Sequence, residues 1–184
     1  GEHPLWIVYS SGTTGLPKPI VHSHVGMLVD QLKASAFHLD AHRGDRMFWF
    51  TTTGWVMWNV MVGVLLTEAS IIIYDGSPGH PDLGVLWDLA EDTGMTMFGT
   101  SASYIQSCMK AGIRPREGRE LAALTALGST GSALSPEGFD WVYGELGPDI
   151  WLGSISGGTD VAGPFLGPVP WLPVYRSELQ APIL

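Results

Sequence analysis

The sequence predicts an α/β fold, a doubly wound and mostly parallel β-sheet with flanking helices. Two observations lead to this prediction. Short apolar runs recur along the chain and are continuous rather than alternating, as expected for strands buried on both faces. Longer segments with helical periodicity separate these runs, and repeated βα units of this kind form parallel sheets.

Six apolar runs are the expected strands, at residues 5–9, 47–50, 70–74, 95–98, 124–127 and 150–152. Five helices are expected, at residues 23–37, 55–66, 81–93, 101–110 and from 135 onward. Ser23 and Ser135 stand where helix N-caps are expected. Met27, Leu28 and Leu32 share the face of the first helix that we expect to be buried.

The last part of the chain, residues 163–184, differs because it is rich in proline. Prolines at this density exclude a helix and a central strand. We therefore expect an irregular segment or edge strands around Pro164, Pro168, Pro170, Pro173 and Pro182.

Composition limits the class of function. The 184 residues are 45% hydrophobic and carry a net charge of −9. This suits one globular domain and argues against nucleic acid or an anionic membrane as a partner. The most apolar stretch, residues 55–66, is too short to span a membrane. The only cysteine, Cys108, is expected in the core, and we expect a reducing, cytoplasmic location.

A segment rich in hydroxyl groups and glycine follows the first apolar run. It contains Ser10, Ser11, Gly12, Thr13, Thr14 and Gly15, and then Lys18. Flexible amides and hydroxyls supply hydrogen-bond donors, and the lysine supplies positive charge, so the segment suits a polyphosphate. It is not the common P-loop, because Gly15 is followed by Leu16-Pro17 rather than by lysine. A polar surface turn is the alternative interpretation.

Two further loops follow later strands, at the sheet edge where α/β proteins bind ligands. The run Thr-Thr-Thr-Gly-Trp-Val-Met-Trp-Asn spans residues 51–59, and its Trp55, Val56 and Met57 are candidates for the wall of an acid pocket. Core packing is the alternative for its tryptophans. The loop after residue 127 includes Gly131 and Ser132, which could approach a flat ring without steric conflict, and they are followed by Ala133.

The loop after residue 152 has the sequence Gly-Ser-Ile-Ser-Gly-Gly-Thr-Asp. Gly157 and Gly158 permit close approach to a base or ribose, and Thr159 offers a hydroxyl to phosphate. Asp160 offers the kind of oxygen that Mg²⁺ binds, usually together with phosphates. A simple glycine turn carrying an aspartate is the alternative interpretation.

Together these motifs resemble the adenylate-forming acyl-CoA synthetases. Ser-Gly-Thr-Thr-Gly-x-Pro-Lys matches that family's phosphate loop, and the other loops follow in the family's order over essentially all 184 residues. The strings at residues 51–59, 156–160 and 177–180 are most similar to the acetoacetyl-CoA synthetase branch. The chain departs from the common pattern at Pro19, where glycine is usual, at Ser132 and Ala133, and at Asp160, where glutamate is usual.

The resemblance implies an ATP-dependent carboxylate–CoA ligase that uses ATP, Mg²⁺, coenzyme A and a small carboxylic acid. Lys18, Thr159 and Asp160 are then the catalytic candidates, with Asp160 as the metal ligand. ATP would contact residues 10–15 and Lys18, the loop Gly131, Ser132 and Ala133, and the run Ser156, Gly157, Gly158 and Thr159. Acetate-specific relatives carry tryptophan where this chain has Gly157, so a longer short acid, with acetoacetate first, is expected.

The resemblance also implies that residues 1–184 are one fragment of the ATP- and acyl-binding N-terminal domain, without the C-terminal domain. We expect this fragment to be inactive alone, because the family's ribose-binding aspartate and catalytic lysine have no counterpart after Gln180. A non-catalytic nucleotide-binding module is one alternative. An amino-acid-activating domain of a peptide synthetase is another, but the only acid near its amine site is the poorly matched Asp30. The sequence does not indicate an oligomeric state.

Lys18 provides a test of the phosphate-loop prediction. In a complete enzyme, Lys18→Ala should remove a charge-assisted contact worth roughly 1.5–3 kcal/mol. The loss should appear in turnover with ATP, measured at varied ATP concentration, and not in the melting temperature. Normal activity with a lowered melting temperature would instead favour a purely structural lysine.

Overall fold

The structure is a computed structural model that describes residues 1–10 and 15–183. Its centre is a five-stranded sheet in the order β4-β3-β5-β6-β7, in which all neighbours pair in parallel. The strands are β3 (Arg46–Trp49), β4 (Ser70–Ile71), β5 (Met97–Ser101), β6 (Ala126–Thr130) and β7 (Trp151–Ser154). The predicted doubly wound α/β fold is confirmed.

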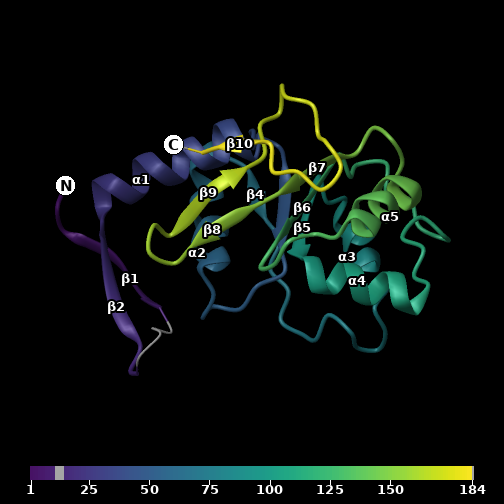
Figure 1. Cartoon of the computed structure of the whole chain (residues 1–184), viewed down its shortest axis with the longest axis horizontal. Helices are drawn as coiled ribbons and strands as arrows, with labels where there is room; N and C mark the ends of the chain where they lie inside the picture. The colour runs from purple at the N-terminus through teal and green to yellow at the C-terminus, as the bar shows by residue number, and fades with distance from the viewer. Residues whose placement is uncertain (11–14, 184) are drawn as a thin grey trace.

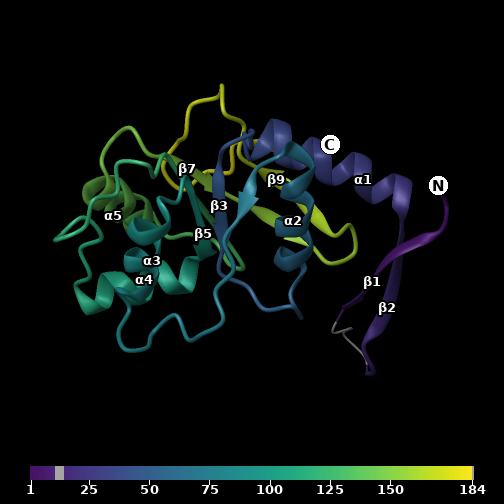
Figure 2. The ribbon, with the colours of Figure 1, turned by 180° about the vertical axis from the view of Figure 1, so that it is seen from behind.

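Helices cover both faces of this sheet (Figures 1 and 2). The chain passes from β3 outward to β4, and then reverses past β3 to β5, β6 and β7. Parallel crossovers are right-handed as a rule, so a reversal of direction along the sheet moves the connecting helix to the other face. One face therefore carries α2 (Val56–Val64), and the opposite face carries α3 (Val85–Thr93), α4 (Ala102–Ala111) and α5 (Pro136–Leu146).

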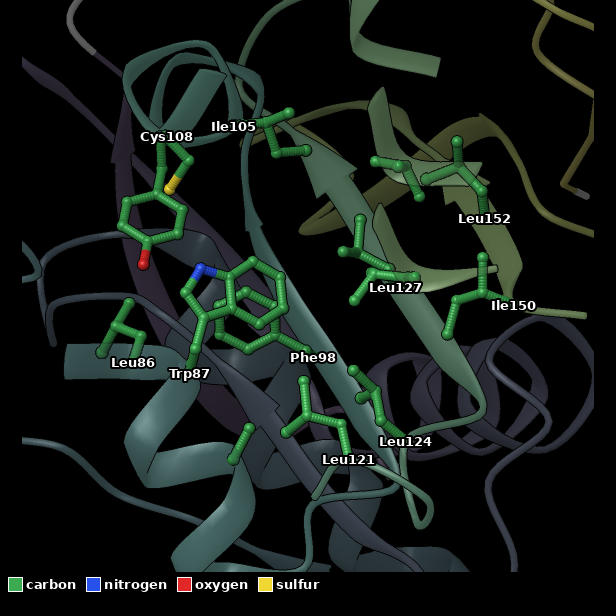
Figure 3. Close-up of a cluster of buried hydrophobic side chains, with 14 of the residues drawn as sticks. Leu86, Trp87, Phe98, Ile105, Cys108, Leu121, Leu124, Leu127, Ile150 and Leu152 are labelled. Atoms are coloured by element: carbon green, nitrogen blue, oxygen red, sulfur yellow. The ribbon is translucent and has the colours of Figure 1, made fainter. Parts of the chain in front are cut away.

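The strand register sorts the core into two clusters. Phe48, Phe98, Leu127 and Leu152 are paired in register and pack under α3, α4 and α5, next to residues such as Trp87 (Figure 3). The neighbouring row packs under α2 and consists of Met47, Met97, Ala126 and Trp151. Cys108 is fully buried in the first cluster, as predicted, and burial raises the pKa of its thiol.

A row of glycines lies near the carboxyl ends of the central strands. Trp49 pairs in register with Gly99, which pairs with Gly128, which pairs with Gly153. The buried Trp49 ring lies across the first two glycines. A Cβ atom added at Gly99 would overlap the ring, and one added at Gly128 would lie 2.6 Å from it. Only glycine allows this close approach.

The first predicted strand lies outside the main sheet, although it was expected to belong to the mostly parallel sheet. β1 (Pro4–Ser10) pairs antiparallel with β2 (Lys18–Ser23), a strand that the sequence analysis missed. The connection between them is too short for a parallel crossover, which needs a dozen or more residues. The hairpin projects from the body beside the N-terminal end of α1 (Figure 1).

α1 (His24–Lys33) begins where predicted, with the Ser23 hydroxyl accepting a hydrogen bond from the Gly26 amide. It continues into a π-helical turn, η1 (Ala34–His38). The predicted buried face is wrong in part, because Leu28 and Leu32 are 45% and 46% exposed. Met27 is buried as expected, and Gln31 lies buried one turn further along the same face.

The proline-rich segment forms part of a second small sheet. Its order is β10-β9-β8, with β8 (Ser156–Gly158), β9 (Gly163–Gly167) and β10 (Ala181–Pro182) all antiparallel. The expectation of edge strands is therefore wrong for β9, which is central and contains Pro164. The pairing of β8 with β9 is irregular between Ser156 and Gly157, and Gly157 is the residue opposite Pro164.

Other boundaries shift by a few residues. α3 begins at Val85 rather than near residue 81, because the Asp82 carboxylate accepts a hydrogen bond from the Gly84 amide in a preceding turn. The 55–66 helix ends as a short 3-10 turn, η2 (Leu65–Thr67). Among the described residues, no helix has the length and apolar character that crossing a membrane requires.

The glycine row provides a stability test. Gly99→Ala should lower the free energy of unfolding by about 1–3 kcal/mol, because the methyl group forces the Trp49 ring away from the sheet. Urea unfolding followed by tryptophan fluorescence measures this change.

Gly144→Ala is the matched control, because Gly144 lies in α5 and an added Cβ would meet nothing within 4 Å. It should raise stability by up to about 1 kcal/mol, the usual helix preference for alanine over glycine. Equal effects of the two substitutions would contradict the role assigned to the glycine row.

Candidate functional site

A cavity of about 490 Å³ lies beyond the carboxyl ends of β6 and β7, between α2, η1 and the small sheet. This size is typical of small-molecule sites. Three of the four predicted loops meet there. The predicted residues that line the cavity are Trp55, Val56, Met57, Gly131, Ser132, Ala133, Ser156, Gly157, Gly158 and Thr159.

The phosphate-loop residues are not part of this lining. Ser10, Gly15 and Lys18 lie on or beside the β1–β2 hairpin and do not line the cavity. Ser11, Gly12, Thr13 and Thr14 lie outside the described residues. Asp160 is exposed and follows directly after the lining residue Thr159.

The N-terminus of α2, which follows the loop after β3, lies at the cavity. Trp55 is the N-cap residue, and its side chain makes no capping hydrogen bond. The first amides of α2 belong to the lining residues Val56 and Met57. An uncapped helix N-terminus carries partial positive charge and free N–H donors, which favour an anionic group. The wall predicted to contact the acid is thus also electrostatically suited to a carboxylate.

The loop after β6 meets the Trp55 ring. A Cβ atom at Gly131 would lie 3.9 Å from that ring, so the predicted acid wall and the predicted adenine loop are neighbours. Gly131 has a φ of +87°, a conformation that favours glycine. The Thr130 hydroxyl donates to the Ile155 carbonyl at 2.8 Å and ties the carboxyl ends of β6 and β7 together.

Gly157 lines the cavity, but a side chain at this position would not point freely into it. A Cβ atom added there would lie 2.5 Å from the Gly163 carbonyl oxygen and 2.9 Å from the Pro164 Cα atom. A larger residue would therefore have to separate β8 from β9. The role of Gly157 in setting pocket depth remains a prediction, and substitution of Gly157 by tryptophan would not test it without moving the backbone.

Thr159 and Asp160 lie in the tight turn that joins β8 to β9. The Ala162 amide donates to the Thr159 carbonyl at 3.1 Å and closes this turn. Ala162 is fully buried with a φ of +50°, which is uncommon for a residue other than glycine. Among the described residues, no three His, Cys, Asp or Glu side chains cluster as a metal site. A lone Asp160 carboxylate suits Mg²⁺, which commonly keeps waters and phosphate ligands.

Several lining residues were not predicted as site residues. His38 belongs to η1, and its Nδ1 lies 3.0 Å from the Pro168 carbonyl oxygen. Since a carbonyl oxygen can only accept, Nδ1 is the donor in this hydrogen bond. No sequence signal marked His38, since a π-helical turn has no clear pattern. His38 and Glu178 are the only ionisable residues in the lining, within the part of the chain that the structure describes.

The segment carrying Glu178 did have a sequence signal, the Ser-Glu-Leu-Gln string at residues 177–180. Ser177 has a φ of +68°, a conformation that is uncommon for a residue other than glycine. Next to it, Arg176 donates two hydrogen bonds of 2.8 Å to the Asp140 carboxylate of α5. These hydrogen bonds lower the pKa of Asp140 and hold the segment against the main domain.

Comparison with known proteins shows the family of the chain. Residues 1–171 match the family described as AMP-binding enzyme, which covers most of the chain. The chain belongs to this family. It is 49% identical over 180 residues to the acetoacetyl-coenzyme A synthetase of Rhizobium meliloti (strain 1021). The aligned region covers 98% of this chain and 28% of that protein.

Two further similarities bear on the site. The solved structure of an acetoacetyl-CoA synthetase from Streptomyces lividans superposes with a TM-score of 0.95 at 53% identity, over 100% of this chain and 29% of that one. A malonamoyl-CoA synthetase of Penicillium aethiopicum is 39% identical over 97% of this chain and 27% of its own length. The chain thus spans less than a third of the length of these relatives.

Proposed function

We propose that this chain is the ATP- and acid-binding part of a carboxylate–CoA ligase that acts on acetoacetate. The proposal rests on one observation above all: a single cavity collects three of the predicted loops. The similarity to acetoacetyl-CoA synthetases at 49% and 53% identity supports it. We also propose that residues 1–184 belong to the N-terminal domain of a longer enzyme, and that a protein with one buried cysteine works in the reducing cytoplasm.

The proposed reaction has two steps. A carboxylate oxygen of the acid attacks the α-phosphorus of ATP, the bond to the β-phosphate oxygen breaks, and pyrophosphate leaves. The thiolate sulfur of coenzyme A then attacks the acyl carbon, and AMP leaves with the bonding electrons. In such a reaction the protein contributes mainly positioning and charge neutralisation.

The residues divide this work between binding the nucleotide and binding the acid. Gly131, Ser132 and Ala133, with Ser156, Gly157 and Gly158, would border the adenosine. The N-terminus of α2, with Trp55, Val56 and Met57, would bind the acid. Residues 10–15, Lys18 and Thr159 would hold phosphate oxygens, and Asp160 would hold Mg²⁺, which supplies positive charge to the phosphates.

The charge of the cavity supports the proposal that residues beyond this chain are also needed. Its lining, as far as the structure describes it, contains neither lysine nor arginine and includes Glu178. Two anionic substrates would meet there, so cations must come from outside the lining. Lys18 and a bound metal are two sources, and the remaining length of the relatives offers others.

The names of the relatives support a proposal for the class of acid. Two of these relatives are an acetoacetyl-coenzyme A synthetase and a malonamoyl-CoA synthetase, and the corresponding acids, acetoacetate and malonamate, are short carboxylates with a carbonyl group on carbon 3. We propose this 3-oxo acid class for the present protein. No observation favours an amino acid, because the Asp30 carboxylate already binds Lys33 Nζ at 2.8 Å.

The acid preference tests the proposed function. In the full-length protein that carries this chain, kcat/KM for acetoacetate should exceed that for acetate by about 10- to 200-fold, the usual effect of extra buried groups. Coenzyme A thioester formation with acetate, butyrate and acetoacetate measures this, and some reaction with butyrate is expected. A preference for acetate or for a long-chain acid would contradict the proposal.

Asp160 tests the metal assignment. Asp160→Asn keeps the shape and removes the charge, so the half-saturating Mg²⁺ concentration should rise and adenylate formation should fall, with partial rescue by excess Mg²⁺. Asp160→Glu is the matched variant and should retain more activity. Pyrophosphate exchange at varied Mg²⁺ measures both, and an unchanged Mg²⁺ dependence of the Asn variant would exclude Asp160 as a ligand.

A further inference from the structure

A buried glutamine in α1 contacts the turn that carries Thr159 and Asp160. We propose that Gln31 is a positioning residue that fixes this turn relative to the phosphate-loop hairpin. The proposal rests on the proposed function, because it assumes that Thr159 and Asp160 contact phosphate and metal. Gln31 itself touches neither substrate.

The contact is direct and enclosed. Gln31 is 2% exposed, and its Nε2 donates to the Ala162 carbonyl oxygen at 3.1 Å. α2 confines the side chain from another side. A Cβ atom at Gly63 would lie 2.5 Å from Gln31 Oε1, so this position of α2 has room only for glycine. A long polar side chain fully enclosed between two helices and a turn has little freedom to move.

The turn needs such support. Ala162 has a positive φ, which alanine adopts only where its surroundings hold it. Its amide closes the turn onto Thr159, and its carbonyl is the atom that Gln31 holds. Asp30 packs beside the same turn, because its Oδ2 lies 3.1 Å from where a Cβ atom of Gly163 would stand. Gln31 thus holds the Ala162 carbonyl by a hydrogen bond, and the neighbouring Asp30 of α1 lies close to the next residue, Gly163.

α1 also begins at the phosphate-loop hairpin. Its N-cap is Ser23, the last residue of β2, and Lys18 is the first residue of that strand. One helix therefore connects the strand that carries Lys18 to the turn that carries Thr159 and Asp160. Lys18 on one side and Thr159 and Asp160 on the other would have to bind the same polyphosphate, so the distance between them would affect ATP binding. Gln31 is the side chain through which α1 sets that spacing.

The experiment removes the donor and keeps the bulk. In the full-length protein, Gln31→Met should raise the half-saturating concentration of Mg²⁺·ATP about tenfold, the lower end of the effect seen for groups that orient ligating residues. The KM for the acid should stay near the wild-type value. In the ligand-free protein, hydrogen exchange at the Ala162 amide should become faster, a readout that is independent of activity.

Ser35→Ala is the matched control. Ser35 is fully buried one turn beyond Gln31 and has no hydrogen-bond partner for its hydroxyl among the described residues. This variant should leave the Mg²⁺·ATP dependence and the exchange at Ala162 unchanged. Gln31→Asn is a milder second variant if the Met variant does not fold. It keeps the amide but shortens its reach, and should shift both readouts in the same direction.

The outcomes separate the two proposals. If Gln31→Met lowers the melting temperature but leaves Mg²⁺·ATP binding and Ala162 exchange as in wild type, Gln31 is only a structural residue and the inference is wrong. If wild type forms no adenylate with any acid, the proposed function fails. In that case, exchange at Ala162 still decides whether Gln31 orders the turn.

Discussion

The glycine row across the main sheet is the constraint on which the site depends. Gly99 and Gly128 let the Trp49 ring lie flat on the sheet, and Gly153 does the same for Pro168, whose Cγ atom would be 3.0 Å from an added Cβ. Pro168 follows β9, so its close approach sets the height of the small sheet above β7. The Pro168 carbonyl also holds the His38 ring at the cavity wall.

The cavity and the charged candidate residues Lys18 and Asp160 lie on different parts of the structure. The cavity supplies shape, apolar walls and the uncapped N-terminus of α2, but its described lining contains no lysine or arginine. The lysine of the phosphate loop lies on a separate hairpin, and the carboxylate assigned to Mg²⁺ lies on an exposed turn. Binding of ATP would therefore require these elements to be held at fixed distances from the cavity. α1, η1 and the small sheet make the contacts that can do this.

Composition alone did not reveal that part of the predicted loop after residue 152 is a strand of the small sheet. The sequence places the Gly-Gly-Thr-Asp run in a loop, where its glycines are expected to permit close approach of a base or ribose and, at Gly157, a longer acid. In the structure, Gly157 and Gly158 belong to β8, and the hydrogen of Gly157 faces the β9 backbone. The glycine is thus required by strand packing as well as by any ligand. The small size of Gly157 is needed for β8 to pack against β9, whether or not a ligand is bound.

The sequence by itself determined the features that depend on near neighbours. Hydrophobic periodicity located the strands of the main sheet, and Ser23 and Ser135 cap their helices as expected because a cap bonds to an amide three residues away. It also marked the loops that line the cavity. Only the tertiary structure decided the antiparallel hairpin, the central position of β9 and the roles of Gln31 and His38. The side chains of Gln31 and His38 bond to partners 131 and 130 residues away, and no local pattern encodes contacts over such a distance.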